Sequence, residues 1–226
     1  MAVIFEDTFT EGTDVALTAH TPSPTGTSWV VEFNDSASVA NVVAATDKAT
    51  PSGTVGSTGW VYTGRPNPTN AEYDVEVTID VNAIDDPIGP VARFTAISDF
   101  YALRCSGGTT QTKDIAIYKR VASTNTELAT FDGTVVDADA IKFEVRDATK
   151  KGYQNATERV STTDNALTSA GSYGLFWGGD TTAPNAWVFQ TGDDVQTGCT
   201  GDNFKVTEVD APGGTTWVSW WGAGTW

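Results

Sequence analysis

Three carboxylates repeat at every second position in the stretch from Glu72 to Val81, EYDVEVTIDV. Glu72, Asp74 and Glu76 alternate with apolar residues, and a period of two is typical of a β-strand with one buried face. Residues two apart on a strand lie about 6.6 Å from each other on the same face. Such a row can act as acid and base in hydrolysis, bind an ion, or form a solvated, salt-bridged sheet face. The residues alone leave these three alternatives open.

Aromatic and guanidinium side chains indicate a second kind of site. Sugars stack their C–H faces on aromatic rings, and planar guanidinium groups bind hydroxyls and carboxylates. Tyrosine and tryptophan on strands also occur in the core or at the rim of a sheet. The candidates for a glycan-binding face are Arg93, Tyr101, Arg104, Tyr118 and Trp177.

Charge and composition argue against several functions. The formal net charge is −16, with 29 acidic and 13 basic residues, which disfavours binding to nucleic acid or to an anionic membrane. The single histidine, His20, lies in a turn-like stretch beside prolines, so His-dependent nucleophilic catalysis and transition-metal sites are not expected. No segment reaches 18 consecutive apolar residues, and the first residues predict a strand rather than an export signal.

Short alternating runs separated by turn residues predict an all-β chain. Such a series without helical periodicity indicates a two-sheet antiparallel sandwich or jelly roll, here as one domain over residues 1–210. The predicted strands are 3–9, 28–33, 38–44, 59–63, 72–81, 89–96, 100–104, 114–121, 126–131, 140–146, 152–155, 159–162, 172–177 and 201–209.

Residues 211–226 differ in composition from the rest and form a predicted C-terminal tail. After a Pro-Gly-Gly hinge, this segment contains half of the eight tryptophans of the chain: Trp217, Trp220, Trp221 and Trp226. Four exposed indole rings are unfavourable in water. We expect the tail to pack on its own sandwich, to dock on another copy or protein, or to stack on sugars.

Two cysteines, Cys105 and Cys199, leave the redox state open. Both lie in Ser/Gly/Thr-rich surroundings far apart in the sequence. They can be free thiols or form one disulfide, which would indicate an oxidising environment.

The order of the strand motifs resembles the concanavalin A-like lectin/glucanase superfamily, in its laminin-G-like branch. The resemblance begins with the first strand, FEDTF, and implies two curved antiparallel sheets, one convex and one concave. Members include lectins, carbohydrate-binding modules, glycosidases and bacteriophage surface proteins, so the fold does not specify a function. The matching pieces are YDVEV from Tyr73, VARF from Val91, FYAL from Phe100, IAIYK from Ile115, IKFEV from Ile141, GSYGLF from Gly171 and GDNFKV from Gly201.

The carboxylate row is also similar to the E-x-D-x-E strand of family 16 glycoside hydrolases. That resemblance implies Glu72 as nucleophile, Glu76 as acid/base and Asp74 as the residue that tunes them, in retaining hydrolysis. The chain departs from the motif at Tyr73, where the family has an aliphatic residue. The residues before the strand, RPNPTNA, also lack the Trp-Pro and Gly of the family.

The superfamily resemblance further implies one structural calcium ion. Asp202 is similar to an aspartate that binds calcium in many members, and the site would join the last strand to the N-terminal segment at Asp7. Calcium takes six to eight oxygen ligands, many of them backbone carbonyls.

These observations predict a non-enzymatic structural or adhesion protein on a virion surface, with a cell-surface polysaccharide as a candidate ligand. The tail would attach it to other virion proteins or to its own copies. The alternatives are a glycoside hydrolase that uses Glu72, Asp74 and Glu76, and a secreted carbohydrate-binding module.

Overall fold

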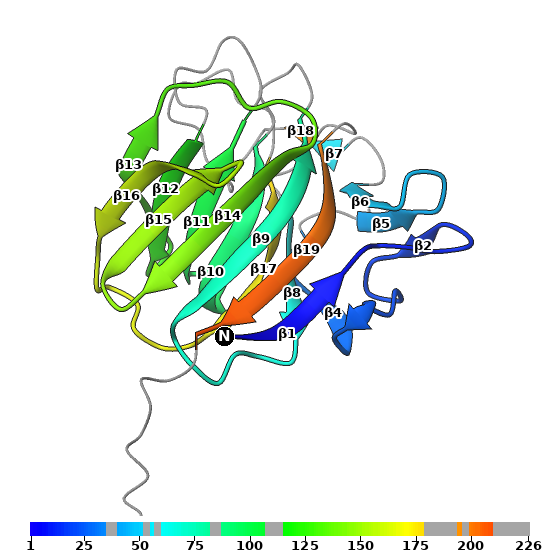
Figure 1. Ribbon diagram of the computed structural model, residues 1–226, viewed down its shortest axis with the longest axis horizontal. Coiled ribbons are helices and arrows are strands. Elements are labelled where there is room, and N and C mark those ends of the chain that lie inside the picture. Colours follow the sequence, from blue (N-terminus) through cyan, green and yellow to red (C-terminus); the bar gives the residue numbers. More distant parts are fainter. Residues whose placement is uncertain are drawn as a thin grey trace, which may run out of the picture.

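The computed structural model describes residues 1–34, 40–51, 55–56, 60–81, 87–106, 115–178, 194–195 and 199–209. All regular structure in this part of the chain is β-strand, so no helix long enough to cross a membrane occurs there. Two antiparallel sheets pack face to face, with the larger one in front in Figure 1. The predicted two-sheet antiparallel jelly-roll sandwich is confirmed.

The front sheet has ten strands and the rear sheet seven. The ten-stranded sheet contains β1 (Ala2–Asp7), β2 (Val15–Ala16), β3 (Pro24–Thr25), β5 (Ala40–Val43), β6 (Lys48–Pro51), β9 (Tyr73–Asp80), β14 (Asp139–Arg146), β15 (Thr149–Gln154), β16 (Thr157–Thr163) and β19 (Thr200–Glu208). The seven-stranded sheet contains β4 (Ser28–Asn34), β8 (Trp60–Arg65), β10 (Ile88–Ala96), β11 (Asp99–Cys105), β12 (Ile115–Val121), β13 (Thr124–Phe131) and β17 (Ser172–Trp177). A separate pair joins β7 (Val55–Gly56) to β18 (Asp194–Val195).

Every strand predicted from the sequence is present, with ends displaced by a few residues. The sequence missed β2, β3, β6, β7 and β18, which span only two to four residues each and are too short to show a period. The last described strand ends at Glu208. The tail 211–226, with its four tryptophans, lies outside the described residues and stays a prediction, as does the boundary at residue 210.

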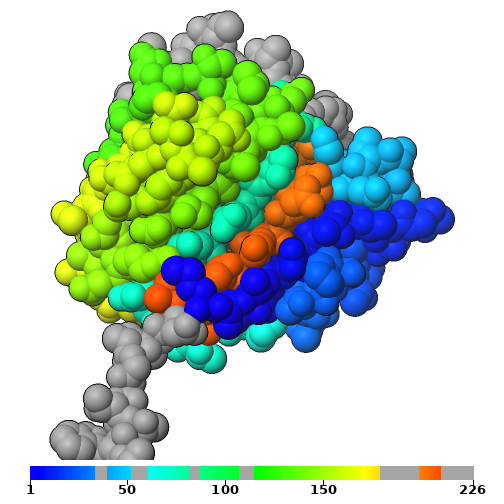
Figure 2. Space-filling model, in the orientation of Figure 1, coloured from blue at the N-terminus to red at the C-terminus, as the bar shows by residue number. Residues whose placement is uncertain are grey.

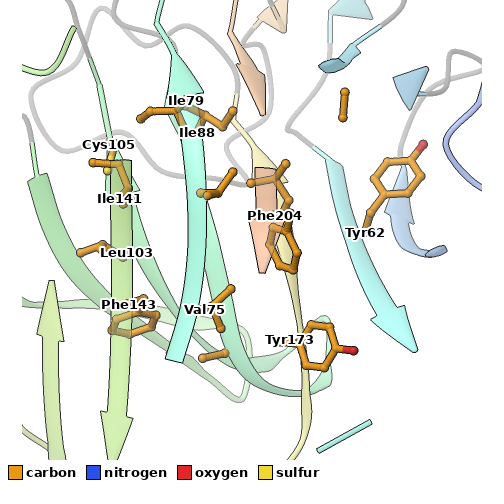
Figure 3. Close-up of a cluster of buried hydrophobic side chains, with 14 of the residues drawn as sticks. Tyr62, Val75, Ile79, Ile88, Leu103, Cys105, Ile141, Phe143, Tyr173 and Phe204 are labelled. Atoms are coloured by element: carbon orange, nitrogen blue, oxygen red, sulfur yellow. The ribbon is translucent and has the colours of Figure 1, made fainter. Parts of the chain in front are cut away.

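The predicted inward row of β9 forms one wall of the core. Tyr73, Val75, Val77 and Ile79 are each at most 2% exposed. They pack against the inner side chains of the seven-stranded sheet, among them Leu103, in the cluster shown in Figure 3. The apolar side chains of β9 therefore hold the two layers together, as the alternation predicted.

Both cysteines lie in this core and are not joined by a disulfide. Cys105 is fully buried and Cys199 is 1% exposed.

β9 lies near the middle of the ten-stranded sheet, between β14 and β19. β1 pairs with the other side of β19, so the N-terminal strand lies beside the last strand, as Figure 1 shows. In the order β14-β9-β19-β1, four strands from distant parts of the sequence share one outer face.

A buried carboxylate links β1 to the opposite sheet. Asp7 is fully buried, and its Oδ2 accepts a hydrogen bond of 2.6 Å from Trp29 Nε1 of β4. Its Oδ1 accepts one from Phe9 N at 2.9 Å and lies 2.8 Å from His20 Nε2. His20 Nδ1 in turn lies 2.6 Å from Glu11 Oε1. Trp29 also meets the ring of Phe5 edge-on at a centroid distance of 5.1 Å, so apolar and polar contacts fix the same corner.

We expect this corner to lose stability as the pH rises. Burial lowers the pKa of His20, but the hydrogen bonds and charges of Asp7 and Glu11 outweigh burial and raise the pKa above its usual value. The protonated ring therefore stabilises the fold fully below the unfolded-state pKa of about 6.5, and this contribution is lost as the pH passes the raised folded-state value. Urea unfolding between pH 5.5 and 8.5 should show the loss in the native protein.

His20→Gln is the control, because His20 is the only histidine in the chain. The difference in unfolding free energy between the native protein and the variant should shrink with rising pH. Parallel curves over the whole range would contradict the role assigned to His20.

Candidate functional site

The five residues proposed for a glycan-binding face are buried. Tyr101 is fully buried, Arg93 and Trp177 are 1% exposed, and Arg104 and Tyr118 are 2% exposed. Tyr101 and Trp177 belong to the core between the sheets. Arg104 and Tyr118 follow the core residues Leu103 and Ile117, so they lie on the outer side of the same strands. The prediction that these five side chains line a glycan-binding face is corrected, because side chains this buried offer a sugar no surface.

Arg93 and Tyr101 instead form hydrogen bonds to the segments that precede β9 and β17. The Arg93 guanidinium donates hydrogen bonds to the carbonyl oxygens of Ala71, at 3.0 and 3.1 Å, and of Leu167, at 2.7 Å. Tyr101 Oη donates to Asp164 Oδ1 at 2.5 Å. Their polar groups are used to position a loop.

The carboxylate row is divided among three different environments. Glu72 precedes β9, which begins at Tyr73. Asp74 is 7% exposed, and its Oδ1 accepts a hydrogen bond of 2.5 Å from Arg146 Nη2 on β14. Glu76 lies farther along, in a groove considered below. The three residues therefore do not form the uniform row that the alternation predicted.

Asp74 and Arg146 form a partly buried ion pair. Burial raises the pKa of the Asp74 carboxyl, and the charges of Arg146 and Lys142 lower it by less. We expect Arg146→Met to reduce the free energy of unfolding by about 2–3 kcal/mol, because it leaves a desolvated carboxylate without its main partner. The double variant Asp74→Asn/Arg146→Met should regain most of that loss in urea unfolding. Equal destabilisation in the single and double variants would mean that the two side chains are not coupled.

The predicted calcium pair is not brought together. Both Asp7 oxygens are occupied inside the core by Trp29, Phe9 and His20. Asp202 lies on β19, and its oxygens accept hydrogen bonds from Asn203 N at 2.7 Å and Asn203 Nδ2 at 2.8 Å. The described residues contain no cluster of three His, Cys, Asp or Glu side chains that could hold a metal ion. Backbone pairing of β1 with β19 joins the segments that calcium was expected to join.

A polar pocket lies at one end of the seven-stranded sheet, on its outer side. Its volume is about 340 Å³, and four adjacent strands, β4, β8, β17 and β10, contribute to it. The lining residues are Glu32, Arg65, Asn67, Phe94, Thr95, Gly171 and Ser172.

A β-bulge in β4 places the carboxylate of this pocket. Val31 pairs with Tyr62 and Phe33 with Val61, so Glu32 is the extra residue of the edge strand. Bulges redirect a side chain at the cost of local pairing. Glu32 Oε1 accepts hydrogen bonds from Thr63 Oγ1 at 2.5 Å and from Arg65 Nη2 at 2.9 Å.

A network of hydrogen-bonded side chains continues from Arg65 through Ser172 to Asn67. Arg65 Nη1 donates to Thr63 Oγ1 at 2.7 Å and lies 3.5 Å from Ser172 Oγ. Ser172 Oγ donates to Asn67 Oδ1 at 2.9 Å. No hydrogen bond within the described residues involves Glu32 Oε2 or Asn67 Nδ2. The pocket therefore offers a free acceptor and a free donor on side chains that are already held in place.

A second bulge, in β10, shapes the other side of the pocket. Ala92 and Arg93 lie opposite the single residue Tyr173, and Arg93 adopts a left-handed φ of 50°. Gly171, with a φ of 57°, packs against this bulge, where an added Cβ would lie 2.5 Å from the Arg93 carbonyl carbon. Only glycine fits there without displacing the backbone.

Tyr73 supports the bulge from the core side. Its hydroxyl accepts a hydrogen bond from Arg93 N. It lies 3.1 Å from the carbonyl oxygen of Ala170 and 3.3 Å from that of Ser172, between which it shares its proton. Tyr73, the residue that departs from the hydrolase motif, thus provides hydrogen-bond partners for backbone groups near the bulge.

The residues of this pocket were not predicted from the sequence. In the run Val30-Val31-Glu32-Phe33, a glutamate interrupts apolar residues without regular alternation, which is the only local sign of a bulge. Arg65, Asn67 and Ser172 carry no signal in the sequence, because the pairing of β8 with β17 brings them together.

Tyr73→Phe should destabilise the protein by about 1–3 kcal/mol, because the buried Arg93 N–H loses its acceptor. Thermal or urea unfolding measures this loss. Tyr153→Phe, on the outer face of the ten-stranded sheet, is the matched control and should change the stability by less. An equal loss of stability in the two variants would contradict the role assigned to the Tyr73 hydroxyl.

Comparison with known proteins shows likeness in fold only. No protein-family model matches the sequence, and no curated protein matches it either. Among solved structures, the carbohydrate-binding module CBM66 from Bacillus subtilis is 10% identical with a TM-score of 0.54, covering 79% of this chain and 95% of that one. The Ca²⁺/Man2-bound exoplasmic/lumenal domain of VIP36 is 11% identical with a TM-score of 0.58, covering 87% of each chain.

A GH43 protein, BlXynB from Bacillus licheniformis in its K247S mutant form, is 13% identical with a TM-score of 0.60. The match covers 90% of this chain and only 39% of that one. These structures and the strand order given above agree on the architecture. The chain has a two-sheet jelly-roll fold similar to that of these structures.

Proposed function

We propose that this protein is a non-enzymatic carbohydrate-binding module whose ligand site is the polar pocket of the seven-stranded sheet. The network of Glu32, Arg65, Asn67 and Ser172 is the observation that carries the proposal. A sugar hydroxyl both donates and accepts hydrogen bonds, so the free Glu32 Oε2 and Asn67 Nδ2 are suitable partners. Because the network is already formed, little side-chain entropy is lost on binding.

The ligand class follows from charge and size. Glu32 and Arg65 neutralise each other in the pocket, so a neutral sugar meets no unbalanced charge. The volume of about 340 Å³ lies at the lower end of the usual range for small-molecule pockets, about 300–1,000 Å³. A pocket of this size favours the terminal unit of a glycan. The lectin and carbohydrate-binding module among the structural neighbours support the same class of ligand.

The non-enzymatic part of the proposal rests on the three carboxylates of the hydrolase motif. Retaining hydrolysis needs two carboxyl groups about 5–5.5 Å apart. Asp74, which the motif implies as the tuning residue, is held in an ion pair by Arg146, and Glu76 lies between Lys142 and Lys205. These surroundings favour a structural or binding role for the carboxylates over a catalytic one.

Attachment to a virion, and a location on its surface, stay predictions from the sequence. They depend on the tail 211–226, which lies outside the described residues. The polysaccharide site proposed above does not depend on them.

Affinity electrophoresis tests the pocket. The native protein should be retarded in gels that contain at least one neutral polysaccharide from a panel of laminarin, xylan, levan, dextran and yeast mannan. Glu32→Gln and Asn67→Ala should each weaken this binding by tenfold or more, which corresponds to about 1.4 kcal/mol.

Asp132→Asn is the control for Glu32→Gln, because it removes one negative charge from an exposed position outside the pocket. It should behave as the native protein does. Retardation by none of the polysaccharides, or equal retardation of the native protein and both pocket variants, would refute the proposed site. Release of reducing sugar from the bound polysaccharide would refute the non-enzymatic assignment.

A further inference from the structure

A groove lies on the opposite side of the sandwich, on the outer face of the ten-stranded sheet. It has a volume of about 510 Å³ and lies over the neighbouring strands β14, β9, β19 and β1. Figure 2 views this face, with β19 in orange between β1 in blue and β9 in cyan. The charged side chains that line the groove are Lys142, Glu76, Lys205 and Glu6.

These four side chains form a row of alternating charge across the strands. Glu76 lies opposite Lys142 on one side and opposite Lys205 on the other. Glu6 lies opposite Lys205 on the next strand. Neighbouring strands are about 4.8 Å apart, so the row is about 14 Å long.

The row is not a ladder of closed ion pairs. Within the described residues, the side chains of Glu6, Glu76 and Lys205 form no ion pair and no hydrogen bond. Elsewhere on the same face, Lys151 and Glu158 form an ion pair, with 2.8 Å between Nζ and Oε2. The protein therefore leaves the hydrogen-bonding capacity of three consecutive groove residues unused.

Lys142 ends the row in a fixed position. Its ammonium group lies 4.2 Å from the centre of the Tyr153 ring, 3.8 Å from Glu144 and 4.0 Å from Asp74. Asp74 and Arg146 are paired with each other and are not among the residues that line the groove.

The alternation selects a class of ligand. A carboxylate or phosphate chain would meet Glu76 and Glu6, and a cationic chain would meet Lys142 and Lys205, so either one faces repulsion at every second position. A hydroxyl group donates to a carboxylate and accepts from an ammonium group, so a neutral polyhydroxylated chain matches every member of the row.

We propose that the groove is a second carbohydrate site, for the interior of a neutral polysaccharide chain. This inference rests on the proposed function of the pocket and extends it. An open groove across four strands accommodates a continuous chain, whereas the pocket on the other sheet accepts a chain end. Two sites on opposite faces make one domain bivalent, so it can cross-link polysaccharide chains and gain affinity on long ones.

The test uses the polysaccharide from the panel that retards the full chain most. Glu76→Gln/Lys205→Gln removes two members of the row and leaves the net charge unchanged. The matched control is Lys151→Gln/Glu158→Gln, which removes an ion pair from the same face, outside the groove lining, and also preserves the net charge. Light scattering on mixing measures cross-linking, and affinity electrophoresis measures binding.

We expect the native protein and the control to raise the scattering of the polysaccharide at least fivefold. The groove variant should lose this rise and still be retarded in the gel through its pocket. Scattering by the groove variant equal to that of the control, or no rise with the native protein despite retardation, overturns the groove and leaves the pocket intact. If no polysaccharide retards the native protein, both proposals fail.

Self-association could also cause cross-linking. Size-exclusion chromatography of each protein without polysaccharide separates this case. The proposal requires the native protein and the groove variant to elute at the same volume. A shift to a smaller species in the groove variant would identify the groove as an interface between copies and overturn the assignment.

Discussion

The register of β9 is the constraint on which the rest of this structure depends. Its inward row closes the core, and the first residue of that row, Tyr73, ends in a hydroxyl that reaches the opposite sheet. There it satisfies Arg93 N at the bulge of β10 and lies within hydrogen-bonding distance of the carbonyl oxygen of Ser172. A shift of one residue would turn these side chains to solvent and remove the support of the pocket at once.

The proposed pocket and the proposed groove both lie where the regular pairing of a sheet is interrupted. The pocket lies between two bulges, at Glu32 and Arg93, each of which frees a residue from strict alternation. The groove lies where β19 shifts its register between Asp202 and Lys205. Structures of the same fold at about 10% identity need not share such local features, so the likeness in fold does not carry over to either site.

Two carboxylates of one strand have different fates because their neighbours differ. Asp74 faces Glu144 across the sheet, and Arg146 reaches it from two residues farther along β14. Glu76 lies opposite Lys142 on one side and Lys205 on the other, and forms an ion pair with neither of them. The partially buried pair fixes the sheet, whereas the open row keeps its polar groups available. In a chain with a net charge of −16, two lysines beside two glutamates make the groove locally neutral.

The longer strands, their inward faces and the two-sheet architecture could be predicted from the sequence, because they follow from a period of two that each of these strands carries locally. The same period predicted that the carboxylates of β9 lie on the outer face of the sheet. The contacts of those carboxylates and of the aromatic residues follow instead from how distant strands assemble in the folded protein. Tyr101 and Trp177 are buried in the core, and Arg93 donates hydrogen bonds to a loop, because the pairing of distant strands determines which side chains are buried. Glu32, Arg65 and Ser172 meet through the strand order β4-β8-β17. Ser172 is 107 residues from Arg65 in the sequence, and no local pattern encodes such a contact.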